Sequence, residues 1–358
     1  MQHTLPISPE EWQSPSPLLN VPKVDLHIHQ EVAPRLDRVL AAREGRLPYD
    51  WATWAARLVS EIPPGIARLR QLSRIFPVDP DLDAPPDNFI ARLEDLLEEA
   101  AMQGAILVEV RFGGETMLRP DYLDLFREAE RRVQSRHPSL HAEAIATLLL
   151  WYEPERLERV VQACLSQVAQ GLRGVDFLSE PYDEEAEWET ARSIAQRALD
   201  AGLGVTVHAG EFSSANLAAA ASLPGVTRIG HAAFATSDQR LLDLLGERQL
   251  TVECCLSCNV LLGAVSSLEN HPIRQLVAQG IPVVLGTDDP VQLGTDIGQE
   301  YRLASMLGFS QQALTKLTRH ALSVAFTTPE RRHHLLTLLD PPHPLSSLGE
   351  ETRENMGE

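Results

Sequence analysis

Residues 24–29 read Val24-Asp25-Leu26-His27-Ile28-His29, a brief apolar run that ends on two histidines separated by one residue. In a strand, residues i and i+2 point to the same face, so both imidazoles can reach one metal ion. Later segments repeat this form, closing an apolar run on a ligand-type or acid–base residue. They are Gly174-Val175-Asp176-Phe177-Leu178, Val205-Thr206-Val207-His208-Ala209-Gly210-Glu211, Arg228-Ile229-Gly230-His231 and Leu285-Gly286-Thr287-Asp288-Asp289-Pro290. The pattern indicates an enzyme with one metal-centred hydrolase site.

Strand-like runs alternate with stretches of helical periodicity, and this order favours a parallel sheet covered by helices. Eight strands are expected, at residues 24–27, 105–111, 141–150, 174–178, 205–209, 228–230, 251–254 and 283–286. Helices are expected at residues 87–102, 122–136, 153–170, 184–201, 238–247 and 271–279. Eight strands with intervening helices predict an α/β fold, a (β/α)8 TIM barrel, with functional residues at the strand ends. We expect one such domain over residues 21–340.

Between the first two strands lies a long insertion, residues 35–86, with two expected helices. It carries four aromatic residues, Tyr49, Trp51, Trp54 and Phe76. Because it follows the C-terminal end of a strand, it is either a helical lid or pocket wall, or an extra packing layer. The chain from residue 310 is expected to be helical. Residues 1–20 would form an N-terminal extension, and residues 341–358 a poorly ordered polar tail.

Acidic residues outnumber basic ones, with 50 Asp and Glu against 31 Lys and Arg and a net charge of −19. This balance argues against nucleic-acid binding through a basic face. No signal peptide and no stretch of about eighteen apolar residues is found, so no membrane association is expected. The four cysteines, Cys164, Cys254, Cys255 and Cys258, suit a reducing compartment. We therefore expect a cytoplasmic protein; an oligomer is compatible with the sequence but not indicated by it.

His208 ends a second strand and Asp288 ends the last one, so a barrel would bring both to the same mouth as His27 and His29. Three imidazoles and one carboxylate form a ligand set suited to zinc, with one position left for water. Taken singly, each histidine is more often an ordinary polar residue at a strand end. Their appearance in order at strand ends favours one metal site per chain.

Acid–base candidates accompany the ligands. Glu211 follows His208 by three residues, which places a carboxyl near the metal and the substrate; its structural alternative is a carboxylate at a helix N-terminus. His231 is a second candidate. The pair Asp288 and Asp289 could divide contacts between metal and substrate, or Asp-Asp-Pro could simply cap a helix.

These segments resemble the signature segments of the adenosine deaminase family, within the amidohydrolase superfamily. The resemblance rests on His27-Ile28-His29, His208-Ala209-Gly210-Glu211, Gly230-His231 and Thr287-Asp288-Asp289-Pro290, with Ser257-Cys258-Asn259 and Glu300-Tyr301 as lesser matches. It covers the chain from about Pro22 to about Phe326. It implies a (β/α)8 barrel with one Zn²⁺ held by His27, His29, His208 and Asp288.

The resemblance also implies roles for single residues. His231 would act on the attacking water as a base or an electrostatic stabiliser, and Asp288 would orient the hydroxide. Glu211 would protonate the purine nitrogen beside the attacked carbon. Asp289 would hydrogen-bond the purine edge. His29 and Gly210 would also contact the substrate.

Two positions depart from the adenosine pattern. Adenosine-specific members usually continue Leu-Asp-Gly after the second histidine, and this chain has Gln30-Glu31-Val32. Glu31 would either intrude on the ribose position, contact another group, or keep the family contact through a shifted backbone. At the end of the fourth strand, Ser179 stands where the family has a glycine whose amide contacts the purine, so the pocket would be narrower. The expected reaction is therefore zinc-dependent hydrolytic deamination of a 6-aminopurine, either adenosine or deoxyadenosine, or else adenine or a 6-aminodeoxyfutalosine-type nucleoside.

Other hypotheses about the function have less support in the sequence than the aminopurine deaminase. His141-Ala142-Glu143 with Cys255-Leu256-Ser257-Cys258 mimics the signature of cytidine-type deaminases, but 114 positions separate the two halves. A redox pair Cys255/Cys258 is a further alternative. A hydrolase of esters, lactones or amides would not need Glu211 as proton donor to a ring nitrogen. A barrel that had lost catalysis would lack a ligand or Glu211, and the sequence retains all of them.

Overall fold

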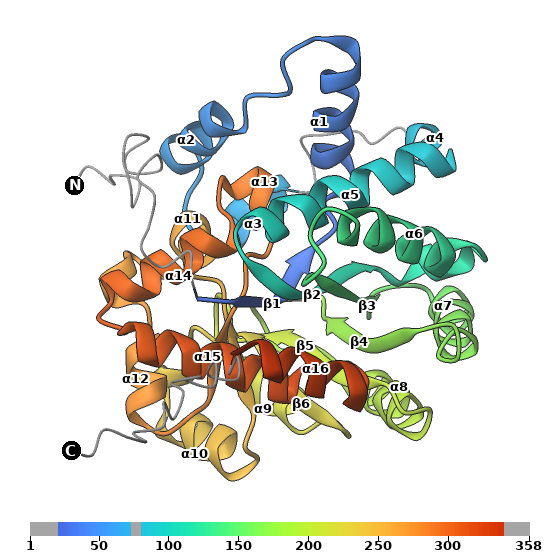
Figure 1. Ribbon diagram of the computed structural model, residues 1–358. Helices are drawn as coiled ribbons and strands as arrows, with labels where there is room; N and C mark the ends of the chain where they lie inside the picture. Colours follow the sequence, from blue (N-terminus) through green and yellow to red (C-terminus); the bar gives the residue numbers. More distant parts are fainter. Residues whose placement is uncertain (1–20, 73–79, 340–358) are drawn as a thin grey trace, which may run out of the picture.

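Eight parallel strands pair in chain order, so each strand lies beside the next one along the sequence (Figure 1). The computed structural model of the protein describes residues 21–72 and 80–339. β8 returns to β1 through a parallel bridge between Ile28 and Asp288, so the sheet closes into a (β/α)8 barrel. All eight predicted strands are confirmed. They are β1 (Lys23–His29), β2 (Ala105–Gly113), β3 (His141–Leu149), β4 (Leu172–Leu178), β5 (Gly204–Ala209), β6 (Val226–His231), β7 (Thr251–Cys254) and β8 (Val283–Leu285).

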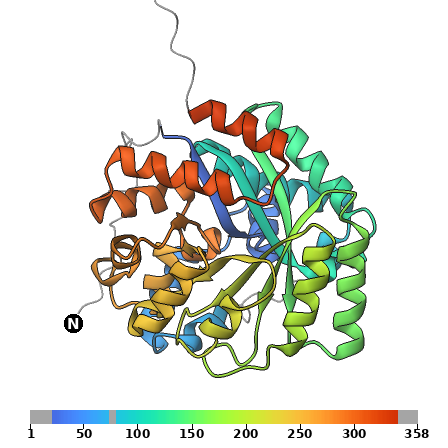
Figure 2. The same ribbon diagram turned by 90° about the horizontal axis from the view of Figure 1, so that it is seen from below.

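Helices surround the strands on the outside of the barrel (Figure 2). The six predicted ones are α5 (Pro86–Met102), α6 (Tyr122–Gln134), α7 (Pro154–Ser166), α8 (Glu189–Asp200), α10 (Gln239–Glu247) and α12 (Ile273–Ala278). In α6 the buried side chains Leu123, Phe126 and Val133 recur at helical spacing and form one face toward the core. Helix α8 begins five residues later than predicted. The Asn216 side chain holds the backbone of Glu184 and Ala186 at 2.8 and 2.9 Å, which keeps this segment in a loop.

Shorter elements follow several strands at the C-terminal mouth. They are η3 (Gly114–Leu118), α9 (Leu217–Ala221), η4 (Ala235–Ser237), α11 (Leu256–Leu262), η5 (Leu268–Asn270), α13 (Pro290–Leu293) and α14 (Ile297–Met306). The expected helical C-terminal region is present as α15 (Gln311–Val324) and α16 (Pro329–Leu339). Helix α15 packs against α16 and against β1 and β8, so it covers the seam where the barrel closes.

The insertion after β1 contains more helix than predicted. In place of two helices, its described part has α1 (Val32–Glu44), α2 (Trp51–Glu61), α3 (Ile66–Leu72) and α4 (Pro80–Asp83). Helix α2 packs on α11 and α13, and it buries Trp51 and Trp54 in an apolar cluster with Cys258 and Val291. The insertion therefore forms a packed wall beside the strand ends, and Tyr49 is partly exposed. Phe76 and residues 1–20 and 340–358 lie outside the described residues.

A layer of charged side chains fills the inside of the barrel below the strand ends. We call it the charge layer: Glu109 and Arg111 from β2, Arg228 from β6 and Glu253 from β7, all fully buried. Arg228 pairs with both Glu109 and Glu253, and Arg111 pairs with Glu253. Because β2 is not adjacent to β6 or β7, these partners can meet only across the interior. Each buried charge has an opposite partner, as a low-dielectric interior requires.

All four cysteines are buried free thiols. None of the helices in the described part of the chain is both long enough and apolar enough to span a membrane.

Candidate functional site

The predicted metal ligands converge at the C-terminal ends of the strands. His27 and His29 come from β1, His208 from β5, and Asp288 directly follows β8. The Nε2 atom of His208 lies 3.0 Å from that of His27 and 3.3 Å from that of His29. One carboxylate oxygen of Asp288 lies 3.2 Å from His29 Nε2 and 3.8 Å from His27 Nε2. Four potential donor atoms thus face one small space.

Local backbone geometry aims these side chains. Asp288 has a left-handed backbone (φ 65°), and its carbonyl and amide exchange hydrogen bonds of 2.7 Å with the backbone of His29 and His27. Such a conformation is unfavourable for a residue with a Cβ and persists where surrounding bonds enforce it. Glycine is required at positions 230 and 286, since a Cβ there would lie 2.8 and 2.5 Å from His27 side-chain atoms. Close backbone approach therefore makes room for the His27 ring.

In two of these histidines, the Nδ1 atom, which points away from the centre of the site, donates a hydrogen bond to a carboxylate. Glu253 accepts from His27 Nδ1 at 2.8 Å, and Asp176 accepts from His208 Nδ1. Burial opposes ionisation of Asp176, but His208 and Arg111 outweigh it and lower its pKa to about 2. Since a carboxylate only accepts, both Nδ1 atoms carry protons, and each Nε2 atom can present a lone pair to the centre of the site.

Two lone pairs that face each other at 3.0 Å repel unless a cation lies between them. A histidine that donates its Nδ1–H to a carboxylate is also the usual arrangement of a zinc ligand. The donor set of imidazole nitrogens and one carboxylate therefore fits a zinc ion. A second geometric grouping places His27, His208, His231 and Asp288 within 4.8 Å of one another, so distance alone does not separate His29 from His231 as the third imidazole.

His231 ends β6 and differs from the other histidines in its surroundings. Asn259 donates an amide hydrogen to its Nδ1 at 3.1 Å, and Asn259 Oδ1 in turn accepts from His271 Nε2 at 3.1 Å. Its Nε2 points to the centre, 3.9 Å from Asp288 and 3.8 Å from Glu211. Burial, opposed in part by Asp288, lowers the pKa of His231 to about 3. The ring is therefore neutral at physiological pH.

Glu211 follows β5 and comes directly after Gly210. Gly210 has a left-handed backbone (φ 77°), and a Cβ added there would lie 3.1 Å from Cα of Ala232. The Glu211 carboxyl is buried and accepts a hydrogen bond from the Tyr182 hydroxyl at 2.9 Å. Burial, reinforced by the charge of Asp288, raises the pKa of Glu211 to about 8. A carboxyl of this kind carries a proton at neutral pH and can donate it.

Two predicted substrate-binding carboxylates lie at α13. Burial and the neighbouring Asp288 raise the pKa of Asp289 to about 7, and the residue precedes the first turn of the helix. Both oxygens of Glu31 are occupied: they accept from the backbone amides of Val291 and Gln292 at 3.0 and 2.9 Å. Arg35 pairs with the same carboxyl at 3.3 Å. Glu31 thus contacts protein groups through both oxygens.

Ser179, the other departure from the adenosine pattern, is almost fully buried after β4. Its hydroxyl lies 3.4 Å from both the carbonyl of Pro181 and the amide of Asn216. The same Asn216 amide donates to the carbonyls of Pro181, Tyr182 and Glu184. A single side chain therefore ties down the loop that presents Tyr182 to Glu211.

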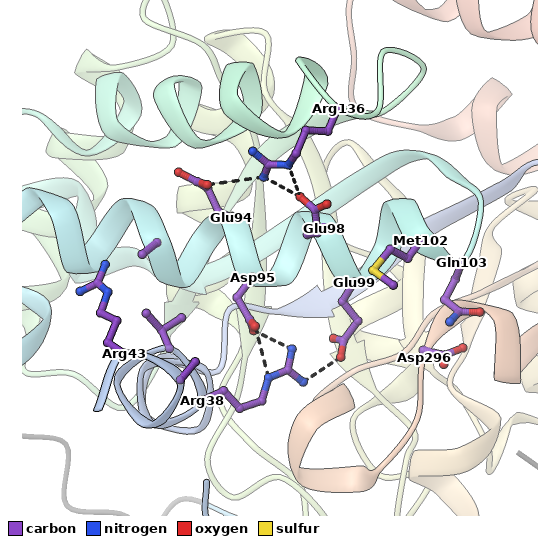
Figure 3. A pocket seen from close by; sticks show the side chains of 13 residues that line it. Arg38, Arg43, Glu94, Asp95, Glu98, Glu99, Met102, Gln103, Arg136 and Asp296 are labelled. Atoms are coloured by element: carbon purple, nitrogen blue, oxygen red, sulfur yellow. Dashed lines mark hydrogen bonds and ion pairs between the residues drawn. The ribbon is translucent and has the colours of Figure 1, made fainter. Parts of the chain in front are cut away.

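A charged groove of about 680 Å³ lies elsewhere, along α1 and α5 (Figure 3). Figure 3 shows Arg38 between Asp95 and Glu99, which it contacts at 2.7 and 2.8 Å. Arg35 reaches the same two carboxylates from inside, at 3.1 and 2.9 Å. The groove is thus lined by ion pairs, and Arg35 joins it to Glu31.

Sequence reasoning identified the residues that face the centre but missed those that support them. Glu253, Arg111, Asn259, His271 and Tyr182 were given no role, and Asp176 was noted only as a strand-end residue. A signal existed for Glu253 and Arg111, because a charged residue inside a buried strand needs a buried partner. The cytidine-type alternative is unsupported by the structure: His141 begins β3 at one end of the barrel, whereas Cys255 follows the end of β7 at the other.

Comparisons with known proteins agree with this geometry. Residues 22–342 match the family model described as adenosine deaminase. The chain is 31% identical to an adenosine deaminase of Vibrio parahaemolyticus over 88% of this chain and 96% of that protein. It is 27% identical to an adenine deaminase of Rhizobium leguminosarum over 90% and 99%. An amidohydrolase from Burkholderia ambifaria, solved with bound Zn, shares the fold with a TM-score of 0.73 and 21% identity, over 90% of this chain and 91% of that one.

Proposed function

The chain belongs to the adenosine deaminase family and is a metal-dependent hydrolytic deaminase of adenosine- or adenine-type substrates; we propose that it converts a 6-aminopurine nucleoside, adenosine or deoxyadenosine, to the 6-oxo product and ammonia. The observation that carries this proposal is Glu211, a buried carboxyl that keeps its proton at neutral pH beside the candidate metal ligands. Protonating a ring nitrogen requires a donor of this kind, whereas hydrolysis of an ester or lactone does not.

We propose His27, His29, His208 and Asp288 as ligands of one zinc ion. When bound, zinc would lower the pKa of a water molecule and make hydroxide available near neutral pH. The protein supplies the remaining steps. Glu211 donates its proton to N1 of the purine, which makes C6 electrophilic, and Asp289 hydrogen-bonds the imidazole edge of the base.

The protons balance over the whole reaction. Water adds its oxygen to C6 and forms a C–O bond, and one of its protons passes to the amino nitrogen. The C–N bond then breaks and ammonia leaves. The second proton of the water leaves the new oxygen and restores the acid form of Glu211, while the proton first given to N1 remains in the product.

Free adenine is the second candidate substrate, and Glu31 is the observation that favours it. At this position the family's aspartate serves the ribose 5′-hydroxyl, but here both carboxylate oxygens accept bonds from the α13 backbone. The protein therefore engages both oxygens of Glu31 and leaves this carboxyl fewer acceptor positions for a ribose hydroxyl. Selectivity for the base over the nucleoside would follow.

The test is a substrate panel with zinc-replete protein, in which ammonia release is measured with adenosine, 2′-deoxyadenosine, adenine and 6-aminodeoxyfutalosine. We expect turnover of at least one, with kcat/KM ranking the nucleosides against the free base. Glu211→Gln is the matched control, which should abolish turnover while retaining zinc. Absence of ammonia release from every aminopurine would refute the proposed substrate class.

A further inference from the structure

The Nδ1 partners of three histidines of the site, His27, His208 and His231, separate these residues into two kinds. His27 and His208 donate Nδ1–H to the carboxylates of Glu253 and Asp176. His231 instead faces an amide nitrogen, Nδ2 of Asn259, at 3.1 Å. Amide nitrogen only donates, so Nδ1 of His231 must accept.

The orientation of the Asn259 amide follows from a backbone group. The amide N–H of Ile273 donates to Nδ1 of His271 at 3.2 Å, and a backbone nitrogen cannot act as acceptor. Neutral His271 therefore carries its proton on Nε2, which lies 3.1 Å from Asn259 Oδ1. That contact orients the side-chain carbonyl of Asn259 toward His271, so the NH₂ group of Asn259 faces His231.

The same NH₂ group also lies 3.5 Å from Oε1 of Glu211. Asn259 and His271 are both buried, at 0% and 3% exposure, so water does not compete for these bonds. The chain of donors runs in one direction, from the backbone of α12 to the centre of the site. Because Nδ1 of His231 accepts from Asn259, the single proton of the neutral ring must lie on Nε2.

We propose that His271 and Asn259 are positioning residues that hold His231 as its Nε2–H tautomer, so that His231 donates a hydrogen bond into the site and is not the base for the attacking water. This inference rests on the proposed deaminase function. The Nε2–H group stabilises the negative charge that develops on the oxygen added to C6.

The Nε2 atom of His231 lies 3.9 Å from Oδ2 of Asp288, so the hydrogen on Nε2 faces the centre of the site. The same reasoning removes His231 from the ligand set, because a protonated Nε2 has no lone pair for a metal, and it leaves His29 as the third imidazole.

The decisive measurement is the protonation state of each ring nitrogen, read from long-range ¹H–¹⁵N correlations in zinc-replete protein labelled with ¹⁵N-histidine. We expect a bare Nδ1 and a protonated Nε2 for His231 and His271, and the opposite pattern for His27 and His208. The His231→Gln and His271→Gln variants assign the two signals. A protonated Nδ1 on His231 would overturn the inference, whether or not the protein turns over an aminopurine.

Asn259→Asp tests the kinetic consequence, because an ionised carboxylate accepts but cannot donate and would draw the proton to Nδ1. In a Ser-His-Asp triad, exchanging the carboxylate beside the histidine for an amide reverses the tautomer and lowers kcat on the order of 10⁴-fold. For Asn259→Asp we expect kcat to fall by at least about 10²-fold with little change in KM. Asn88→Asp, the same change at a half-buried position on α5, should leave both constants and the His231 signal unchanged. Unaltered kcat in an Asn259→Asp protein whose His231 signal has reversed would refute the proposed role.

The two proposals fail separately. If no aminopurine is deaminated but the spectrum shows Nε2–H on His231, the deaminase proposal fails and the positioning of His231 stands. If deamination proceeds and His231 carries its proton on Nδ1, the positioning inference fails and the deaminase proposal stands.

Discussion

Replacing Glu211 by glutamine should destroy activity and stabilise the fold at the same time. The glutamine side chain has nearly the same shape, and its carbonyl can still accept from the Tyr182 hydroxyl, which lies 2.9 Å from the native carboxyl. It cannot deliver a proton to a ring nitrogen. Loss of a positioned general acid costs on the order of 10²–10⁴ in rate, so kcat should fall by at least about 10².

The gain in stability follows from the raised pKa. Burial and Asp288 raise the pKa of Glu211 from an ordinary 4.5 to about 8. Between these values the unfolded chain has released the proton that the folded chain still holds, so the unfolded state is favoured by about 1.4 kcal/mol for each pH unit above 4.5. At pH 7 the raised pKa lowers the free energy of unfolding by about 3 kcal/mol. The glutamine variant has no titrating group at this position and avoids this loss of stability.

The assay is urea unfolding of both proteins in the presence of a chelator, at pH 4.5 and pH 7, paired with ammonia release after zinc is restored. The stabilities should be similar at pH 4.5, and the variant should gain its advantage as the pH rises toward 8. A difference that is independent of pH would show that Glu211 does not hold its proton in the fold. Retained turnover would remove Glu211 as the acid.

Four further outcomes are expected. If Glu211 acts as the proposed acid, its protonated form is the active one, so kcat should fall as the pH rises above about 8, measured over pH 6–10; a flat profile would contradict this. Asp176→Asn should weaken zinc affinity about 10–100-fold in competition with a chromophoric chelator, since it removes the partner of His208 Nδ1. Tyr182→Phe should lower kcat, whereas Tyr152→Phe, which breaks a similar Tyr–Glu bond between the segments that follow β3 and β2, should not. Glu31→Ala leaves two buried amides without acceptors at about 1–3 kcal/mol each, so urea unfolding should show a clear loss and KM should rise.

The barrel and the residues facing its centre could be predicted because both depend on short stretches of sequence. A parallel strand buried on both faces reads as an apolar run, and the fold places functional groups just where each run stops. His27, His208 and Asp288 follow this rule, and the structure brings them within a few ångströms. The start of α8 could not be predicted, since it depends on Asn216, which lies beyond the next strand.

Which groups the supporting residues contact could not be predicted, for a related reason, although a charge inside a buried strand already indicated that Glu253 and Arg111 need partners. Glu253 contacts His27 across 226 positions of sequence, and Asn259 finds His231 through a helix that begins after β7. No local pattern encodes such pairs, because they depend on strand register and on which face of a strand points inward. Glu31 is similar: its residue type suggested a substrate contact, but its oxygens lie on the backbone of α13, 260 positions away.

The chemical type of the residue behind each histidine therefore carries information that the histidine itself does not. A carboxylate that accepts from Nδ1 leaves a lone pair on Nε2 and suits the ring to bind a metal, the role proposed for His27 and His208. An amide that donates to Nδ1 leaves the proton on Nε2 and suits the ring to donate a hydrogen bond, the role proposed for His231. Four imidazoles lie close together at one mouth of this barrel, and for three of them the partner of Nδ1 indicates the proposed role. Exchanging a carboxylate and an amide between these positions should exchange the roles, which is why Asp176→Asn should affect zinc while Asn259→Asp should affect turnover.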